Sequence, residues 1–488
     1  MKINIFYFVL FFIILADLAY SQKPADRAKI IEETNVEQLQ EKADKYKRQA
    51  VKEKKKAVEM AKQKGWIIRK EFDNGRVMEI QRVENGKPIY YVTYNLNAAK
   101  TISTDEVWIS GNSGLDLSGS GMKAGVWDES AVRVSHQEFE GRVTQQDDAT
   151  SLSDHATHLA GTIGAAGIDS DAKGMAYQAD INAYDWNSDL SEMNSAAAEG
   201  LLVSNHSYGI PAGYSPDGSE WKWYGDESIS SEEDYKFGFY NSDCAKWDET
   251  ARDARYYQMV VAAGNDRGEG PSDGEHEVDG GNNGYDCISG KALAKNIIAV
   301  GAVKDLTSGY QGNPEAVEIT NFSSWGPADD GRIKPDISAN GKDLYSSLSS
   351  GDSQYAYMSG TSMASPAVAG SLLLLQEHYN NLYAEYMKAA TLKGLMIHTA
   401  DEAGANDGPD YKFGWGLMNT QKAAQLISEV DNKSFIIDTV ISEGGTFTFQ
   451  VYSEGNSPLA ATMTWTDPAG NPVSAQLDPR DPMLVNDL

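Results

Sequence analysis

Four polar residues stand where the sequence predicts the end of a strand or the start of a helix. Asp128 closes the apolar run MKAGVWD, and Asn265 follows the apolar run VVAAG. His155 and Ser362 open segments rich in small and apolar residues, HATHLAGTIGAA and SMASPAVAGSLLLL. Catalytic groups gather at the carboxyl edge of parallel strands, and an asparagine there can donate its amide N–H to an oxyanion. These four residues are our candidates for chemistry.

Each candidate also has a simpler explanation when it is taken alone. A serine at a helix start, here Ser362 with Pro366 in the first turn, is ordinarily only a cap. His155 and His158 stand three residues apart, a spacing that also suits zinc, although the sequence offers no third ligand cluster beside them. The combination is therefore more informative than any single residue.

The elements that must position these residues alternate between short apolar strands and helices. The runs MKAGVWD, INAYDW, YYQMVVAAGN and NIIAVGAV are strand-like, and PAVAGSLLLLQEHY is helix-like. This alternation predicts an α/β fold: a doubly wound, mainly parallel sheet with helices on both faces. The aromatic and acidic stretch 210–255 interrupts the pattern, and we expect it to be a surface loop at the rim of a site.

Composition limits the classes of protein to which the chain can belong. Of its 488 residues, 41% are hydrophobic and 23% are charged, which is typical of soluble folded proteins. The formal net charge of −29 would repel nucleic-acid phosphates, so we expect no nucleic-acid partner.

The four candidate residues lie in motifs that resemble one known family. In the order Asp, His, Asn, Ser, the chain contains GVWD, HATHLAGT, AAGN and GTSMASP. These motifs resemble those of the subtilisin-like serine proteases, the subtilases. The resemblance implies a subtilisin-like protease domain over residues 106–430. It also implies a serine endopeptidase that hydrolyses peptide bonds of protein or peptide substrates and needs no cofactor for catalysis.

The resemblance assigns a role to each candidate. Ser362 would be the nucleophile, His155 the general base and then the general acid, and Asp128 the group that holds the imidazole tautomer. Asn265, helped by the backbone N–H of Ser362, would stabilise the tetrahedral oxyanion.

The same resemblance assigns substrate-binding residues. A strand made of Ser207, Tyr208 and Gly209 would pair with the substrate backbone and form a wall of the first specificity pocket. Ala263 and Gly264, at the end of the strand before the asparagine, are expected to contact substrate as well.

The chain departs from the family pattern at two places. Ala156 replaces the glycine of the histidine motif, and Glu129 and Ser130 replace the small residues that usually follow the aspartate. Glu129 would place a second carboxylate beside the triad, where it would raise the pKa of His155. One alternative function is therefore a catalytically impaired homologue that acts as a protein-binding module. Another is an esterase-like α/β hydrolase, although GTSMA differs from the GxSxG motif of that class.

The first 21 residues predict a secretory signal peptide. One lysine precedes an apolar stretch, and small residues follow it. A membrane anchor is the alternative, but the apolar stretch has about 12 residues where a span needs about 20. We expect a secreted or cell-surface protein with no membrane contact after signal cleavage.

Residues 22–105 predict an N-terminal pro-region. Residues 31–64 have the spacing of an amphipathic helix stopped by Gly65, and three β-type runs, WIIRKEF, RVMEIQRV and PIYYVTYNL, follow as a meander. Residues 1–105 carry 20 basic and 14 acidic side chains, whereas the remainder carries 22 and 57, so the two parts should attract each other. We expect an intramolecular inhibitor; an independent binding module is the alternative.

Residues 431–488 predict a partial antiparallel β-sandwich, because SFIIDTVI, GTFTFQVYS and LAATMTWTD alternate with period two. We expect the chain to stop inside this domain, which resembles the sandwich that follows the protease domain in one secreted subgroup of subtilases. The resemblance also implies structural Ca²⁺. Its ligands stay unassigned, although oxygen donors are frequent here. They are Asp467, Asp478, Asp481, Asn486 and Asp487.

The chain has two cysteines, Cys244 and Cys287. In an exported protein they are permitted to form a disulfide. The alternative is two free thiols, because sequence does not tell whether their backbones come close enough.

Overall fold

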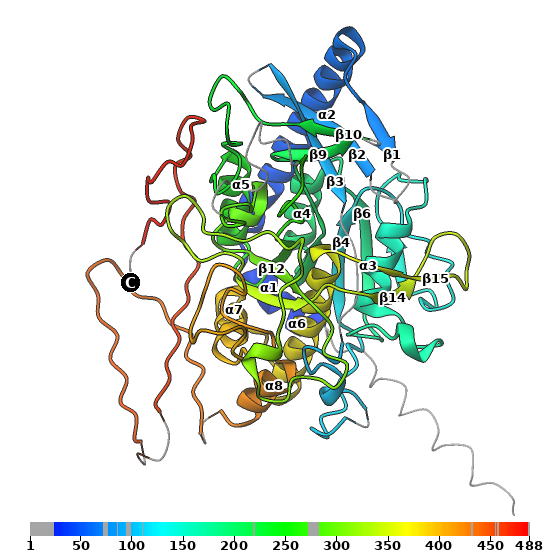
Figure 1. Cartoon of the computed structure of the whole chain (residues 1–488). Coiled ribbons are helices and arrows are strands. Elements are labelled where there is room, and N and C mark those ends of the chain that lie inside the picture. Colours follow the sequence, from blue (N-terminus) through cyan, green and yellow to red (C-terminus); the bar gives the residue numbers. More distant parts are fainter. Residues whose placement is uncertain are drawn as a thin grey trace, which may run out of the picture.

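The computed structural model describes most of the chain from residue 24 onwards (Figure 1). The proposed signal peptide lies outside the described residues. The described ranges are 24–71, 77–84, 86–93, 99–109, 111–217, 220–271, 283–430, 433–453, 455 and 458–486.

A seven-stranded parallel sheet forms the centre of the structure, with the strand order β13, β12, β11, β7, β4, β6, β5. All side chains of β7, β11 and β12 are buried, as expected for a sheet covered on both faces. The strands are β4 (Lys123–Asp128), β5 (Val143–Gln145), β6 (Asp180–Asp185), β7 (Val203–His206), β11 (Gln258–Ala262), β12 (Ile298–Val303) and β13 (Ile337–Asn340). The predicted α/β fold class is confirmed.

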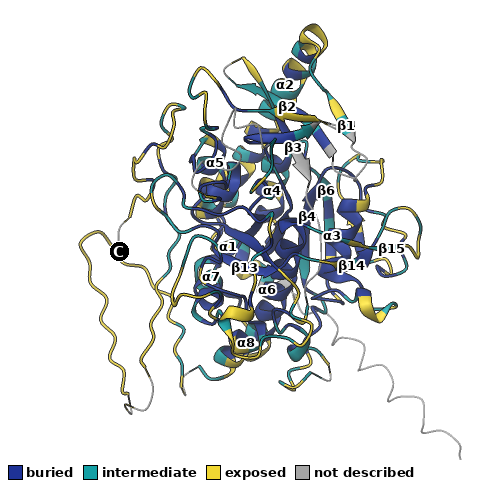
Figure 2. Cartoon of the chain, viewed as in Figure 1, coloured by how far each residue is buried: buried dark blue, intermediate teal, exposed yellow. Residues whose placement is uncertain are grey.

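Helices cover the two faces of this sheet and form separate core clusters. Figure 2 shows the centre of the molecule in the dark blue of buried residues. Val126 of β4 packs in one cluster with α3, α6, α7 and α8, whereas the adjacent Trp127 packs in the other with α4 and α5. Successive strand side chains point to opposite faces, so each face has its own core. The helices are α3 (Asp154–Gly164), α4 (Asp189–Ala198), α5 (Ser242–Asp253), α6 (Thr361–Tyr383), α7 (Ala389–His398) and α8 (Thr420–Ser428).

Shorter elements lie outside the central sheet. The stretch 210–255, expected to be a loop, contains the β9–β10 hairpin and α5, because Cys244 and Trp247 are buried in the second core cluster. The short strands are β8 (Tyr208–Gly209), β9 (Tyr214–Asp217), β10 (Glu220–Trp223), β14 (Leu344–Ser347) and β15 (Tyr355–Met358). The 3₁₀ turns are η1 (Asp105–Val107), η2 (Ser170–Ala172), η3 (Gly290–Leu293) and η4 (Pro314–Ala316).

The N-terminal region has the helix and the meander that its sequence predicts. Helix α2 ends at Gly65, whose N–H bonds to the carbonyl of Ala61. Strands β1, β2 and β3 pair antiparallel in chain order, and Met78, Ile80 and other apolar side chains form a small core under α2. The elements are α1 (Pro24–Glu32), α2 (Val36–Lys64), β1 (Arg69–Glu71), β2 (Val77–Glu84) and β3 (Lys87–Thr93).

This N-terminal region packs on the α/β domain through α2, which lies against α4 and α5. Leu39 of α2 is buried in the second core cluster, and the Ser191 hydroxyl of α4 donates to the carbonyl of Ala43. Ion pairs of opposite sign cross the contact, in agreement with the charge difference between the two parts. They are Lys42–Asp253 at 2.6 Å, Arg82–Asp243 at 2.7 Å, Lys87–Asp226 at 2.7 Å and Arg69–Glu129 at 2.9 Å.

The C-terminal part has neither helix nor strand in residues 433–453 and 458–486, so the predicted sandwich strands do not form here. Apolar side chains of the period-two pattern are exposed instead, and Tyr452 is 92% exposed. A strand needs a paired neighbour and an apolar face to cover, and the described residues offer this segment no second sheet against which to pack. The segment is the orange and red trace at the side of the molecule in Figure 1.

Candidate active site

Asp128 and His155 meet where β4 ends and α3 begins. Ser153 caps α3 by accepting from the N–H of Ala156, which fixes the first turn and the direction of the histidine. Nδ1 of His155 hydrogen-bonds to Oδ2 of Asp128, and both side chains are buried. The aspartate therefore selects the tautomer that carries its proton on Nδ1.

Ser362 lies in the first turn of α6, which packs against α3. Its hydroxyl donates to the carbonyl of Ser207 at 2.9 Å, and the Ser207 hydroxyl donates back to the carbonyl of Ser362 at 2.7 Å. Pro366 lies in the second turn of α6, one turn later than predicted. A helical N–H normally bonds to the carbonyl four residues earlier, and proline has none, so the carbonyl of Ser362 is free to accept from Ser207.

Asn265 follows β11, and its side chain is anchored to the start of α6. Its Oδ1 accepts from the backbone N–H of Thr361 at 3.0 Å and from the Thr361 hydroxyl at 2.9 Å. Both bonds use the side-chain oxygen, which leaves the amide nitrogen to act as a donor. Gly264 takes a φ of +113° just before it, a conformation that L side chains rarely adopt.

The residues expected to bind substrate line the same edge. Tyr208 and Gly209 form β8, and β8 pairs antiparallel with β3 of the N-terminal region. The registered pairs are Val92 with Gly209 and Thr93 with Tyr208. Ala263 is buried at the end of β11. Strand β3 therefore pairs with the same backbone groups of β8 that the sequence predicts to bind substrate.

Glu129 has partners beside the aspartate that sequence reasoning did not identify. Its carboxylate accepts from the Ser153 hydroxyl at 2.5 Å and pairs with Arg69 of β1 at 2.9 Å. Burial first, and then the charge of Asp128, raise the pKa of Glu129 to about 7. Nothing in the local sequence around Arg69 signals this contact, because it depends on how β1 docks.

Lys291 is a second residue that sequence reasoning missed. It is buried, with its ammonium 3.0 Å from the centre of the Tyr208 ring and 3.8 Å from the Asp189 carboxylate. Burial lowers the pKa of Lys291 to about 7. A cation against this ring ties the wall of the predicted pocket to the second core cluster.

His158 is a core histidine. Its Nε2 lies 3.2 Å from the carbonyl of Leu344, and burial lowers the pKa of His158 to about 3, which keeps the ring neutral. In the part of the chain that the structure describes, the one group of acidic or histidine side chains that could hold a metal lies elsewhere, at Glu233, Asp286 and Asp478.

The candidate disulfide is not formed in the structure, and both cysteines are buried. Cys244 packs in the second core cluster, and its thiol donates to the carbonyl of Gly290 at 3.2 Å. Cys287 packs in a different cluster, and its sulfur accepts from the backbone N–H of Trp325 at 3.2 Å. The two cysteine side chains therefore pack in separate hydrophobic clusters. Burial raises the pKa of Cys244 to about 12, so this thiol is unreactive.

Comparison with known proteins decides the family. The sequence profile of the subtilase family matches residues 105–416, which is well over half of the chain. The chain belongs to the subtilase family.

Curated relatives of this subtilase are much longer proteins. C5a peptidase from Streptococcus pyogenes is 32% identical over 152 residues, which cover 29% of this chain and 13% of that protein. The PII-type proteinase of Lacticaseibacillus paracasei is 28% identical over 179 residues, 33% of this chain and 9% of that protein. The chain thus matches about one eighth or less of these relatives.

Two solved structures are similar to this subtilase. The protease domain of PatA has a TM-score of 0.44 at 19% identity, covering 63% of this chain and 94% of that one. The prenylagaramide maturation protease PagA has a TM-score of 0.44 at 20% identity, covering 62% of this chain and 92% of that one.

Within the described ranges, no helix combines the length and apolar character needed to cross a membrane.

Proposed function

We propose that this subtilase is a secreted endopeptidase, made as a precursor, in which Ser362, His155 and Asp128 form the catalytic triad. The observation that supports this most is the hydrogen bond between buried His155 and Asp128 at the start of α3, the helix that packs against α6 and its serine. Secretion is supported by the signal-like sequence of residues 1–21.

The triad residues divide the chemistry of peptide hydrolysis. Asp128 holds the Nδ1 proton, so Nε2 of His155 takes the proton of Ser362 as its oxygen attacks the peptide carbonyl carbon. The C–N bond then breaks, and His155 returns the proton to the leaving amine while an acyl ester remains on Ser362. Water, activated by the same histidine, hydrolyses this ester. A hydroxyl has one proton, so Ser362 must turn from the carbonyl of Ser207 to His155 before the first step.

Asn265 is proposed as the oxyanion donor. The carbonyl oxygen becomes negative only when the tetrahedral intermediate forms, and a rigid donor is most effective against that charge. Anchoring of Oδ1 by Thr361 supports this role, because it orients the amide before substrate arrives. The backbone N–H of Ser362, at the positive end of α6, would be the second donor.

The N-terminal region is proposed to inhibit the enzyme until it is released. Strand β3 uses the backbone of β8, so an extended substrate would have to displace it. The contact of Arg69 with Glu129 extends this attachment to the residue beside Asp128. Opposite charges along α2, α4 and α5 would speed docking at low salt.

A serine-directed probe tests the proposed nucleophile. Wild-type enzyme should react with a fluorophosphonate and hydrolyse a protein substrate, and Ser362→Ala should do neither while its circular dichroism shows a folded chain. The substitution removes one oxygen atom, so the fold should be retained. Undiminished proteolysis by Ser362→Ala would refute the assignment. A wild-type enzyme that folds, loses its N-terminal region and still does not react would favour the impaired homologue.

A further inference from the structure

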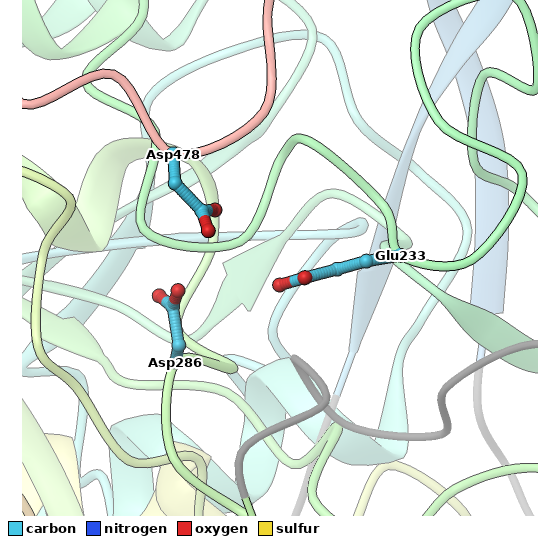
Figure 3. Close-up of side chains that lie close together, drawn as sticks. All are labelled: Glu233, Asp286 and Asp478. Atoms are coloured by element: carbon cyan, nitrogen blue, oxygen red, sulfur yellow. The ribbon is translucent and has the colours of Figure 1, made fainter.

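Carboxylates from separate parts of the chain converge away from the active site. Glu233 comes from the stretch 210–255, Asp286 from the segment before η3, and Asp478 from the C-terminal part. Their oxygens all lie within 4.8 Å of one another. Figure 3 shows the three carboxylates directed towards a shared space.

Asp329 belongs to the same cluster because of Gly238. A methyl group built on Gly238 would lie 2.0 Å from Oδ1 of Asp329 and 2.6 Å from Oδ1 of Asp286, so both oxygens flank one point. The N–H of Asp329 also bonds to the carbonyl of Gly238 at 3.1 Å. Gly238 has a φ of +67°, which favours glycine. A side chain here would fill the space between the carboxylates.

Asp286 is the buried member of this cluster, with 7% of its surface exposed. Its Oδ1 has no hydrogen-bond partner among the described residues, and the same holds for both carboxylate oxygens of Asp329. Buried polar atoms in native proteins nearly always have a partner. An unpartnered carboxylate oxygen aimed at other carboxylates indicates a bound cation.

The carboxylates of this cluster repel one another. Burial, and then the charge of Asp478, raise the pKa of Asp286 to about 7. Burial and the neighbouring carboxylates, Asp286 first, raise the pKa of Asp329 to about 9. Arg480 acts on Asp478, yet burial still leaves the pKa of Asp478 raised. A divalent cation is the simplest source of compensating charge.

We propose that Glu233, Asp286, Asp329 and Asp478 bind one Ca²⁺ ion. The donor set is all oxygen, which hard cations prefer, whereas zinc sites favour nitrogen and sulfur. Ca²⁺ takes six to eight oxygen ligands in flexible geometry, whereas Mg²⁺ usually keeps several waters and binds through one or two carboxylates. A site of four carboxylates therefore suits calcium better than magnesium.

This ion would fasten the C-terminal segment to the protease domain. The segment is already held by the buried ammonium of Lys295, which pairs with Asp467 and donates to the carbonyl of Met483 at 2.7 Å. The Thr464 hydroxyl also donates to the carbonyl of Ala390 at 2.7 Å. Calcium at Asp478 would add a further attachment, to Glu233 of the insertion and to Asp286.

The number of calcium ions bound per chain can be measured without any measurement of activity. The full chain carrying Ser362→Ala, which does not process itself, is freed of metal with a chelator and titrated with CaCl₂ by equilibrium dialysis. Asp286→Asn with Asp329→Asn should bind one ion fewer per chain than this parent. Glu318→Gln, an exposed carboxylate paired with Lys304, should bind the same number as the parent.

Thermal unfolding separates a calcium site from a cluster of protonated acids. Calcium should raise the melting temperature of the parent. The double variant lacks this site, so calcium should raise its melting temperature less. In chelator the double variant should melt above the parent, because repulsion between carboxylates is relieved. Equal calcium stoichiometry in parent and double variant would overturn the proposal, as would a parent that binds no calcium.

A milder variant decides the question if the double variant does not fold. Asp478 is exposed, so Asp478→Asn should fold and weaken one calcium site about 10-fold or more. Unchanged affinity at every site of Asp478→Asn would overturn the assignment of this ligand set.

Discussion

Asn265 shows how a single side chain is prepared for its proposed task, because two bonds from Thr361 fix its oxygen and orient its nitrogen. We expect Asn265→Ala to lower kcat by about 10²- to 10³-fold with little change in KM, since this donor acts mainly in the transition state. Fluorophosphonate labelling should persist. Steady-state kinetics on a peptide substrate measure both constants, and a change confined to KM would contradict the role.

Glu129 should make stability depend on pH. Its pKa is raised in the folded protein from 4.5 to about 7, so its favourable contribution is complete below pH 4.5 and is lost as pH rises through 7. In the Ser362→Ala background, Glu129→Gln should therefore be more stable than its parent above pH 7, on the order of 3 kcal/mol at most. Melting temperatures from pH 4 to 8.5 measure this difference. A pH-independent difference would argue against it, and Glu318→Gln is the control.

The candidate residues could be predicted from sequence because they lie in short motifs, but their contacts could not. GTSMASP gives the position of Ser362, yet its bond with Ser207 follows from Pro366 removing one helical N–H, which only a folded helix reveals. The contact of Arg69 with Glu129 joins residues 60 positions apart and leaves no local signal. The disulfide prediction was wrong for a related reason: burial of each thiol in its own cluster is a tertiary property.

At the scale of elements, β1 should contribute to latency through Arg69. Loss of a charged hydrogen bond to a buried partner costs about 1.5–3 kcal/mol, less here because the arginine is partly exposed. Arg69→Ala should shorten the lag before the secreted precursor becomes active by about 3- to 10-fold. A time course of peptide hydrolysis measures the lag. Arg48→Ala, an exposed arginine of α2, should leave the lag unchanged; equal effects of the two would show that only overall charge matters.

The elements of the N-terminal region and of the central sheet follow from sequence periodicity. Helix α2 and the meander match their apolar spacing, because each buries a face that the pattern marks. The C-terminal part shows the limit of this reasoning. Its period-two pattern is typical of strands, but a strand is stable only when it pairs with other strands. The periodicity of one segment does not predict which other segments pair with it.

For the whole molecule, the structure limits the range of residues in which the cut that releases the N-terminal region is expected. Ile102 and Thr104 are buried in the main core, and the Thr104 hydroxyl lies 2.7 Å from that of Ser371 and 2.8 Å from that of Thr420. These residues belong structurally with the protease domain, so we propose a cut before residue 99 rather than at 105.

Intact-mass analysis of the secreted protein tests this cut. The wild type should lose the N-terminal region, and Ser362→Ala should keep it, because the enzyme is expected to process itself. Equal full-length masses together with full wild-type activity would reject a pro-region. A shortened Ser362→Ala chain would mean that another protease makes the cut.

Strand β8 has one more consequence for the mature enzyme. On the proposed release of β3, β8 would lose the strand with which it pairs. Unpaired backbone groups of a strand act as templates on which other chains can add strands and aggregate. This strand is only two residues long, and Pro211 soon follows it without an N–H to continue the ladder. The opening is thus long enough to hold a short extended peptide and too short to support sheet growth between enzyme molecules.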